Sequence, residues 1–387
     1  MSTREAQRVA RFGTTVFSEF SALARAANAV NLGQGFPDFD GPDEIKQAAI
    51  DAIRGGVNQY AITTGAAALR KAVAEHAARF YGQKVDPDAE VSVASGATEV
   101  IFDAVMALVN PGDDVVVFEP FYDSYVASVE MAGGRCRYVR LKAPTWRFDE
   151  AELAAAFTDR TKLVIVNTPH NPTGKCFTRD ELELIGRLAA EHDAVILSDE
   201  VYEHLVYAPA RHLRPATIPS LAPRTLTVSS GGKSFSFTGW KIGWALGPAD
   251  LVKATQKAHQ FVTFATASPF QEAIAKALLL PDSYFTGFEQ LYRAKRDFLI
   301  EGLKAAGFEP YTPQGTYFVV ADAGRHAKAD DFETCRWLTR EVGVAAIPPS
   351  AFYSAEHKAE AKRLVRFAFC KGDATLAEAV QRLKRLA

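Results

Sequence analysis

Lys233, a lysine within a loop of small residues, could serve three different kinds of chemistry. It lies just after the β-rich run 225–229, in the segment Ser230-Gly231-Gly232-Lys233-Ser234. A phosphate-binding P-loop would require a glycine at the position of Thr227, so that interpretation fails. A serine acyl-transfer site would use Ser230 and Lys233 as an S-x-x-K motif, but its companion S-D-N and K-T-G motifs are absent from the sequence. The third use is a lysine that forms a Schiff base with an aldehyde cofactor, where glycines let the chain pass close under the cofactor ring.

Two other parts of the sequence meet the needs of the aldehyde cofactor pyridoxal phosphate. Its ring nitrogen needs an acidic partner, because a protonated nitrogen makes the ring an electron sink. Asp199 follows the predicted strand 194–198, at the strand end where open α/β sheets bind ligands. The cofactor phosphate needs backbone N–H groups at a helix start, and Ser95-Gly96-Ala97-Thr98 joins a predicted strand to a predicted helix. Together these residues favour the Schiff-base interpretation of Lys233.

Several motifs resemble those of the class I aminotransferases of the fold-type I pyridoxal-phosphate family. The motifs are Asn171-Pro172-Thr173-Gly174, Ser198-Asp199-Glu200-Val201-Tyr202, and Ser230-Gly231-Gly232-Lys233 with Thr238-Gly239-Trp240-Lys241-Ile242-Gly243. The likeness runs nearly end to end, since segments 31–38 and 365–369 also match. Within the family, the chain looks most like the branch of kynurenine/glutamine and methionine aminotransferases and of bacterial N-succinyldiaminopimelate aminotransferases.

The resemblance implies a role for each matching residue. The expected catalytic residues are Lys233, which carries the cofactor and moves the substrate proton, Asp199, which pairs with the ring nitrogen, and Tyr202. Tyr202 and Asn171 are expected to hydrogen-bond the ring oxygen. The full set of expected cofactor contacts is Lys233, Asp199, Asn171, Tyr202, Tyr122, Gly96, Ala97, Thr98, Ser230, Lys241 and Tyr60.

The phosphate contact at Lys241 departs from many relatives, which have arginine there. Lysine neutralises a dianion as a point charge but lacks the bidentate fork, so we expect a somewhat weaker cofactor affinity. Tyr122 is expected to stack on the cofactor, with neighbouring Phe121 or plain core packing as alternatives. The alternative for Asp199 is a helix cap.

The resemblance also implies how the substrate binds. Arg366 is expected to hold the substrate α-carboxylate through two parallel hydrogen bonds, and its alternative is a strand-edge ion pair. The full set of expected substrate contacts is Arg366, Asn171, Gly35, Phe17 and Phe264. Tyr60 and Phe264 are expected to reach the active site of the neighbouring subunit in a homodimer.

The elements that must position these residues follow an alternating pattern. Short β-rich runs alternate with helical patterns from about residue 91, which is typical of a mostly parallel sheet covered by helices. The predicted strands are 91–94, 115–118, 136–140, 163–167, 194–198, 225–229 and 242–246, and the predicted helices between them are 99–109, 149–157 and 179–192. Thr178 and Glu181 form a predicted capping box at the start of the last helix.

The chain divides into three predicted parts. Residues 1–42 are an irregular, Gly- and Pro-containing segment that packs with the small domain, residues 43–285 are a large α/β domain that binds the cofactor, and residues 286–387 are a smaller α+β domain. A long helix, 284–306, leads into the small domain, which contains predicted helices 331–341 and 374–386.

Composition excludes several other classes of protein. The 387 residues carry 44 Lys+Arg against 46 Asp+Glu, so there is no basic field to hold nucleic acid. The longest apolar runs have the length of a strand, which argues against a membrane span, and no signal-peptide core is visible. The four cysteines are far apart and the eight histidines form no metal-ligand motif, so we expect no metal and a reducing, cytoplasmic location.

These observations predict a dimeric pyridoxal-phosphate aminotransferase with a ping-pong mechanism. The favoured amino donors are L-amino acids of the kynurenine, glutamine, methionine or aromatic type, and the acceptor is a 2-oxo acid. The alternatives are transfer from N-succinyldiaminopimelate to 2-oxoglutarate, β-elimination from cysteine S-conjugates, and a non-catalytic regulatory protein that binds the cofactor.

Overall fold

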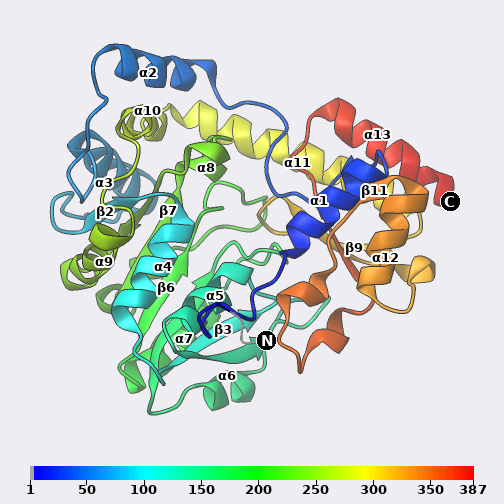
Figure 1. Ribbon diagram of the computed structural model, residues 1–387, viewed down its shortest axis with the longest axis horizontal. Coiled ribbons are helices and arrows are strands. Elements are labelled where there is room, and N and C mark those ends of the chain that lie inside the picture. Colours follow the sequence, from blue (N-terminus) through cyan, green and yellow to red (C-terminus); the bar gives the residue numbers. More distant parts are fainter. Residues whose placement is uncertain (1–3) are drawn as a thin grey trace.

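A seven-stranded sheet forms the centre of the larger part of the molecule (Figure 1). The computed structural model describes residues 4–387. The sheet contains β2 (Val91–Ala94), β3 (Asp114–Glu119), β4 (Arg135–Arg140), β5 (Thr161–Asn167), β6 (Val195–Asp199), β7 (Thr225–Ser230) and β8 (Gly243–Leu246), in the order β2-β8-β7-β6-β5-β3-β4. β8 runs antiparallel to both of its neighbours and all other pairs are parallel. The mostly parallel sheet is therefore confirmed.

Helices cover both faces of this sheet. The helices of this part of the molecule are α2 (Asp43–Arg54), α3 (Ala67–Tyr81), α4 (Ala97–Leu108), α5 (Asp123–Met131), α6 (Glu150–Ala156), α7 (Arg179–Glu191), α8 (Gly231–Ser234), α9 (Ala249–Val262) and α10 (Ser268–Leu278). Alternate residues of β3 face opposite sides, so Val116 and Phe118 pack with α6 and α7 while Val115 and Val117 pack with α4 and α5. The predicted capping box of Thr178 and Glu181 is present at the start of α7.

The carboxyl ends of the strands carry the predicted motifs. Asp199 is the last residue of β6, and the Lys233 loop follows β7 directly. The segment that contains Gly96 joins β2 to α4. Because β6 and β7 are adjacent and parallel, the residues that follow them leave the sheet at the same edge.

A smaller antiparallel sheet lies beside the first, on the right of Figure 1. It has the order β12-β10-β9, formed by β9 (Glu309–Tyr311), β10 (Phe318–Asp322) and β12 (Leu364–Ala368). The helices of this region are α1 (Val16–Ala26), α11 (Asp282–Ala305), α12 (Asp331–Trp337) and α13 (Asp373–Leu383). A short parallel pair, β1 (Val30–Asn31) with β11 (Val344–Ala345), ties the start of the chain to this region. The exact domain limits at residues 42 and 285 stay a prediction.

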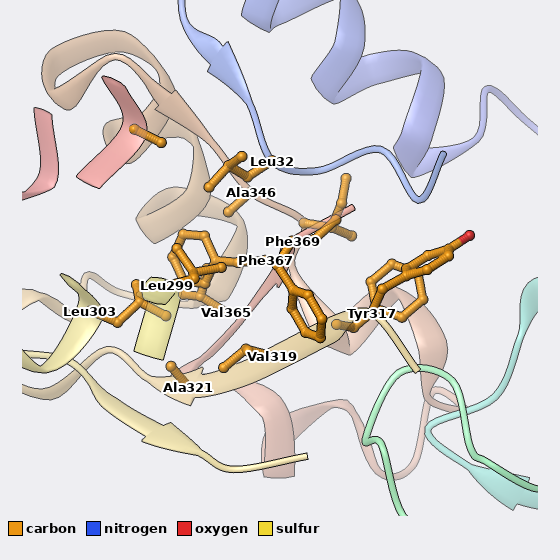
Figure 2. Packing of buried hydrophobic residues seen from close by; sticks show 14 of the residues in the cluster. Leu32, Leu299, Leu303, Tyr317, Val319, Ala321, Ala346, Val365, Phe367 and Phe369 are labelled. Atoms are coloured by element: carbon orange, nitrogen blue, oxygen red, sulfur yellow. The ribbon is translucent and has the colours of Figure 1, made fainter. Parts of the chain in front are cut away.

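A hydrophobic cluster fills the space between α11 and the small sheet (Figure 2). Leu299 and Leu303 of α11 pack against Val365 and Phe367 of β12. The prediction that the first forty residues form an irregular segment is wrong in part, because α1 forms within them. At the start of α1, the Thr15 side chain accepts a hydrogen bond from the Ser18 N–H. The apolar face of α1 is buried in this cluster.

The C-terminal helices differ slightly from their predicted bounds. The helix expected at 331–341 ends as an α-helix at Trp337 and continues as a π-helical turn over Leu338–Val342. Within residues 4–387, no helix has both the length and the apolar character that crossing a membrane requires.

Candidate active site

A cavity of about 260 Å³ opens at the carboxyl edge of the large sheet. It is lined by thirteen of the fifteen predicted site residues, namely Phe17, Gly35, Gly96, Ala97, Thr98, Tyr122, Asn171, Asp199, Tyr202, Ser230, Lys233, Lys241 and Arg366. These residues come from segments that span most of the chain. Tyr60 and Phe264 do not line the cavity.

Lys233 lies on the short helix α8, at the end of the glycine pair that follows β7. A Cβ atom on Gly232 would lie 3.1 Å from the Thr238 Cα, so glycine permits this close turn. Burial lowers the pKa of the Lys233 amine to about 8, and the positive charges of Lys241 and Arg366 act in the same direction. A substantial fraction of this amine is therefore neutral in mildly alkaline solution.

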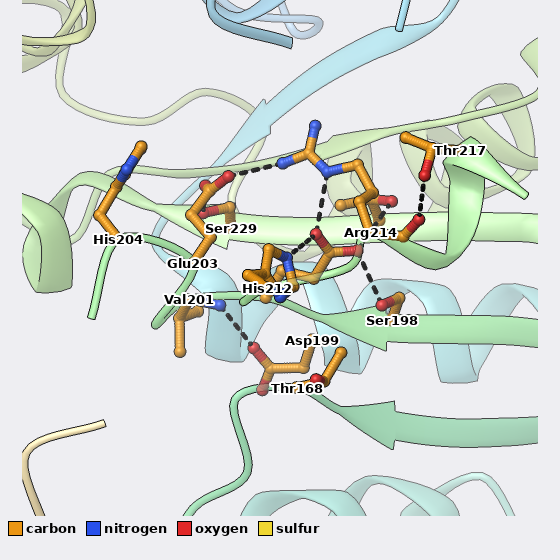
Figure 3. A network of polar contacts seen from close by, with 12 residues as sticks. Thr168, Ser198, Asp199, Val201, Glu203, His204, His212, Arg214, Thr217 and Ser229 are labelled. Carbon is orange, nitrogen blue, oxygen red and sulfur yellow. Dashed lines mark hydrogen bonds and ion pairs between the residues drawn. The ribbon is translucent and has the colours of Figure 1, made fainter. Parts of the chain in front are cut away.

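Asp199 is buried at the end of β6, with both carboxylate oxygens held. The Tyr125 hydroxyl donates a hydrogen bond to Oδ2 at 2.5 Å. The Val201 N–H donates one to Oδ1 at 3.2 Å, which Figure 3 shows. Burial raises the pKa of Asp199 to about 6, although these two hydrogen bonds favour the ionised form. The helix-cap alternative is wrong, because the residues that follow Asp199 form turns and not a helix.

Tyr125 was missed by the motif analysis. It lies on α5, three residues after Tyr122, and the two rings meet edge to face at 5.6 Å. Residues three apart share a helix face, so this spacing is the signal that could have identified it. Asn167 was also missed; it lines the cavity and binds the backbone of both Asp199 and Asn171.

The start of α4 forms an anion-binding hollow. Gly96 has a φ of +82°, and a Cβ atom there would lie 3.2 Å from the Lys241 Nζ. A Cβ atom on Gly243 would lie 2.5 Å from the Ala97 N. The two glycines therefore keep the first N–H groups of α4 and the Lys241 amine free to face a ligand, and both groups favour an anion.

Arg366 is almost fully buried on β12, between the two sheets. Its Nη2 donates to the Gly33 carbonyl at 2.9 Å and its Nη1 donates to the Asn171 Oδ1 at 3.3 Å. Its Nε has no hydrogen-bond partner, and the side chain makes no ion pair with a carboxylate, among residues 4–387. The strand-edge ion pair weighed for Arg366 is therefore wrong. A buried guanidinium N–H without a partner is costly, which favours a carboxylate ligand.

Three aromatic rings surround the Arg366 guanidinium. Its Cζ lies 4.2 Å from the ring centre of Phe318, 5.1 Å from that of Phe352 and 5.3 Å from that of Phe17. Phe318 and Phe352 were not singled out from the sequence, because buried aromatic residues in a strand-rich region are usually core. Phe17 and Phe318 also line the cavity, so they give its Arg366 end an apolar wall.

Comparisons with known proteins show to which family this chain belongs. Residues 27–383 match the family model of class I and II aminotransferases. The chain belongs to this family. A probable N-succinyldiaminopimelate aminotransferase of Mycobacterium tuberculosis is 47% identical over 98% of each protein. The kynurenine–oxoglutarate transaminase of Dictyostelium discoideum is 41% identical over 99% of this chain and 96% of its own length.

Solved structures agree with this assignment. N-succinyldiaminopimelate aminotransferase from M. tuberculosis has a TM-score of 0.95 at 47% identity and covers 99% of this chain and 100% of its own. A methionine aminotransferase from Escherichia coli has a TM-score of 0.95 at 39% identity, with 100% of both chains covered. The resemblance, the fold-type I architecture and the aminotransferase activity are confirmed. Pyridoxal phosphate is the cofactor of this family, and the comparisons favour neither the β-elimination nor the non-catalytic alternative.

The cavity of this aminotransferase fits pyridoxal phosphate. The glycine-lined hollow at the start of α4, with the Lys241 amine, suits a phosphate dianion. Asp199 offers a buried carboxylate with a raised pKa, which a cationic ring nitrogen would satisfy. Lys233 offers an amine with a lowered pKa, as condensation with an aldehyde requires.

The aminotransferase also contains two groups of residues with metal-ligand types, although the sequence predicted no metal site. They are His76 with Glu203 and His204, and Glu99 with Asp103 and His259. In the first group, the Glu203 carboxylate already accepts hydrogen bonds from Arg214 and Ser229 (Figure 3).

In both groups the histidine is already hydrogen-bonded. The His76 and His204 Nε2 atoms lie 2.7 Å apart, and burial lowers the pKa values of these residues to about 4 and about 3, so one neutral ring donates to the other. The His259 Nδ1 lies 2.9 Å from the Glu99 Oε1. In that second group, the Asp103 carboxylate oxygens and the His259 Nε2 have no hydrogen-bond partner among residues 4–387.

Tyr60 and Phe264 lie together on the surface of the molecule. Their rings meet edge to face at 5.4 Å, and 82% of Tyr60 and 45% of Phe264 are exposed. Ile62, Phe261 and Val262 are also exposed hydrophobic residues from the same two segments. Phe264 has a φ of +70°, which is uncommon for a bulky residue.

Proposed function

We propose that this aminotransferase takes the amino group from an L-amino acid of the kynurenine, glutamine, methionine or aromatic type and passes it to a 2-oxo acid in two half-reactions. The observation that carries this proposal is the Arg366 guanidinium. It lies in the cavity of Lys233 and Asp199, its buried Nε lacks a partner among residues 4–387, and three aromatic rings surround it. A 2-amino or 2-oxo carboxylate satisfies the guanidinium and exposes its side chain to the rings.

Lys233 is proposed as the catalytic base. Bound pyridoxal phosphate supplies the electron sink that weakens the bonds to the substrate Cα. With a pKa of about 8, roughly a tenth of the free Lys233 amine is neutral at pH 7. The neutral Nζ accepts the proton released from Cα and, as an ammonium, can give it back at another carbon.

The remaining cofactor contacts are assigned by position in the cavity. Asp199 is proposed to pair with the ring nitrogen, and the hydrogen bonds from Tyr125 and Val201 support this by fixing the carboxylate plane. Tyr202 and Asn171 are proposed to bind the ring oxygen, and Tyr122 to stack on the ring. The residues proposed to bind the phosphate are Gly96, Ala97, Thr98, Ser230 and Lys241.

Arg366 and Asn171 are proposed to bind the substrate carboxylate, with Phe17 and Gly35 beside it. Apolar walls discriminate between related side chains by only about 1–3 kcal/mol, so we expect several donors to be accepted. The 47% identity to a probable N-succinyldiaminopimelate aminotransferase supports that succinylated diamino acid, with glutamate as its counterpart, as a second candidate.

The complete site is proposed to need a second copy of the chain. The exposed aromatic residues Tyr60 and Phe264, with Ile62, Phe261 and Val262 beside them, form an apolar surface that a symmetric partner would bury. Tyr60 would then reach the phosphate site and Phe264 the substrate site of the partner. The four free cysteines support a reducing, cytoplasmic location.

Two experiments test the proposal. Reduction of the cofactor-loaded protein with borohydride, followed by peptide mass spectrometry, should place the cofactor mass on Lys233 and should give no adduct in Lys233→Ala. An adduct on another lysine contradicts the assignment.

The donor class is tested by a panel of L-amino acids and the succinylated diamino acid against several 2-oxo acids. Each donor is paired with the corresponding amine that lacks the α-carboxylate, as a matched control. We expect the highest kcat/KM for aromatic, methionine or glutamine donors and little reaction with the amines. A strong preference for the succinylated donor favours the second candidate instead.

A further inference from the structure

The hydroxyl of Tyr317 touches the Lys233 amine, although no motif pointed to this residue. The Lys233 Nζ donates a hydrogen bond to the Tyr317 Oη at 3.0 Å, and the Tyr317 Oη donates one to the Gly35 carbonyl at 2.5 Å. Figure 2 shows the hydroxyl at the edge of the buried cluster, pointing away from Leu299 and Leu303.

We propose that Tyr317 is a positioning residue that fixes the place of the free Lys233 amine and the direction of its lone pair. The inference rests on the proposed role of Lys233 as the catalytic base. It concerns the stages of the reaction in which the amine of Lys233 is not bound to the cofactor.

The direction of the two hydrogen bonds follows from the atoms involved. A carbonyl oxygen only accepts, so the single hydroxyl proton of Tyr317 is committed to Gly35. Toward Lys233, the hydroxyl oxygen can then offer only a lone pair, and the amine must be the donor. An amine that gives one N–H to Tyr317 keeps its own lone pair in another tetrahedral direction, free to accept a proton from the substrate.

The backbone before Tyr317 is held in an unfavourable conformation. Thr316 is β-branched and has a φ of +66°, a left-handed conformation that costs on the order of 1–3 kcal/mol. Its N–H donates to the Leu205 carbonyl at 2.8 Å, and its carbonyl accepts from the Tyr207 hydroxyl at 2.5 Å. Contacts with Leu205 and Tyr207 therefore hold this turn, and the turn directs Tyr317 toward the Lys233 amine. Strain of this kind is characteristic of functional positions.

The other partner of the hydroxyl is fixed as well. A Cβ atom at Gly35 would lie 2.6 Å from the Phe318 ring, so only glycine allows this carbonyl to come so close. The Tyr317 ring meets the Tyr202 ring edge to face at 5.1 Å and stacks with Tyr292 at 6.1 Å. The hydroxyl thus links the N-terminal segment at Gly35 to the amine of Lys233 through two defined hydrogen bonds.

The experiment compares Tyr317→Phe with Tyr292→Phe as the matched control. Tyr292 is equally buried and its ring stacks on Tyr317, but its hydroxyl makes no hydrogen bond to Lys233. Acetylation of Lys233 in the cofactor-free proteins is followed against pH by peptide mass spectrometry. In Tyr317→Phe, we expect the pKa of Lys233 to fall below the wild-type value, because the oxygen that accepts from the ammonium is gone. In Tyr292→Phe it should not change.

Kinetics of the loaded proteins provide the second readout. For Tyr317→Phe, we expect kcat to fall by about 3- to 10-fold, as expected for one neutral hydrogen bond, with KM changed by less than twofold. A variant that does not touch Lys233, Tyr207→Phe, loosens the Thr316 turn and should move both readouts in the same direction by a smaller amount. It also keeps the test valid if Tyr317→Phe does not fold.

An unchanged acetylation profile and an unchanged kcat in Tyr317→Phe would overturn the inference, even if the variant melts at a lower temperature, because a purely structural tyrosine would behave in that way. Failure of the proposed function has a different signature. In that case, borohydride trapping of the wild type leaves no cofactor on Lys233.

Discussion

Replacing Lys233 with methionine is expected to stabilise the cofactor-free protein at neutral pH. Burial lowers the pKa of this amine from its ordinary value of 10.5 to about 8. Below pH 8 the amine is charged in both the folded and the unfolded chain, so the folded state bears the full cost of a desolvated ammonium. The difference between the two pKa values corresponds to about 3 kcal/mol of free energy of unfolding. Methionine has a similar length and no charge, so it removes this cost.

The difference in free energy of unfolding between Lys233→Met and the wild type should also depend on pH, and this dependence is the sharper test. As the pH rises from 8 to 10.5, the folded amine is neutral while the unfolded one still binds a proton, so the cost declines to about 2 kcal/mol at pH 9 and about 1 kcal/mol at pH 10. The hydrogen bond from Lys233 to Tyr317 is lost at every pH and subtracts about 1 kcal/mol from the gain. Urea unfolding of both cofactor-free proteins between pH 7 and 10 measures the difference. A Lys233→Met variant that is less stable than the wild type at pH 7, or a difference that does not decline with pH, would refute the reasoning.

Three further predictions concern ligand binding and assembly. Arg366→Lys should lower kcat/KM for L-amino acids by about 10- to 150-fold, the value of one charge-assisted hydrogen bond, and should leave the slow reaction of amines without a carboxylate unchanged in steady-state assays. Lys241→Ala should weaken the binding of pyridoxal phosphate by about 10- to 150-fold in a titration, whereas phosphate-free pyridoxal should bind as before. Phe264→Asp should raise the dimer dissociation constant by at least about tenfold in analytical ultracentrifugation, and an unchanged constant would place the interface elsewhere.

Much of the site could be predicted from the sequence because its residues lie in short motifs at strand ends. Asp199 and Lys233 follow adjacent parallel strands, and a glycine-containing turn precedes α4. Positions of this type have few alternatives in an α/β sheet, since the carboxyl ends of parallel strands meet at one edge. The strand pattern was correspondingly accurate, with every predicted strand overlapping an observed one.

The residues that were missed reach Arg366 and Lys233 through tertiary packing. Phe318 lies on β10 and Phe352 follows β11, and both surround Arg366 only because the part of the chain with the small sheet packs against the large sheet. Tyr317 reaches Lys233 because contacts with residues 205 and 207 hold Thr316 in a left-handed conformation. Neither a hydrophobic pattern nor a turn motif encodes such a contact, so these aromatic residues looked like ordinary core. Helix α1 was missed for a related reason, since its stability depends on the cluster against which it packs.

The neighbouring carboxylates of Asp199 and Glu200 differ in role: Asp199 lines the cavity, whereas Glu200 belongs to a network of charged residues inside the protein. Glu200 points to the opposite side of the chain from Asp199, where it accepts hydrogen bonds from Ser198 and Arg214. Nearby Glu203 also pairs with Arg214, whose charge holds the pKa of that carboxylate well below its usual range despite burial. These framework charges satisfy one another within the protein.

The charged groups of the cavity are shifted the other way, toward their neutral forms. Burial raises the pKa of Asp199 to about 6 and lowers those of Lys233 and Arg366 to about 8 and about 10. None of the three forms an ion pair among residues 4–387. In the proposed site, a cationic ring nitrogen would pair with Asp199 and a carboxylate with Arg366, whereas an aldehyde would condense with the neutral Lys233 amine. The cavity is therefore a region where the fold gives up stability, and ligand binding restores it. Because binding to the folded state alone stabilises it, loading with cofactor and then with a 2-oxo acid should raise the melting temperature in two steps.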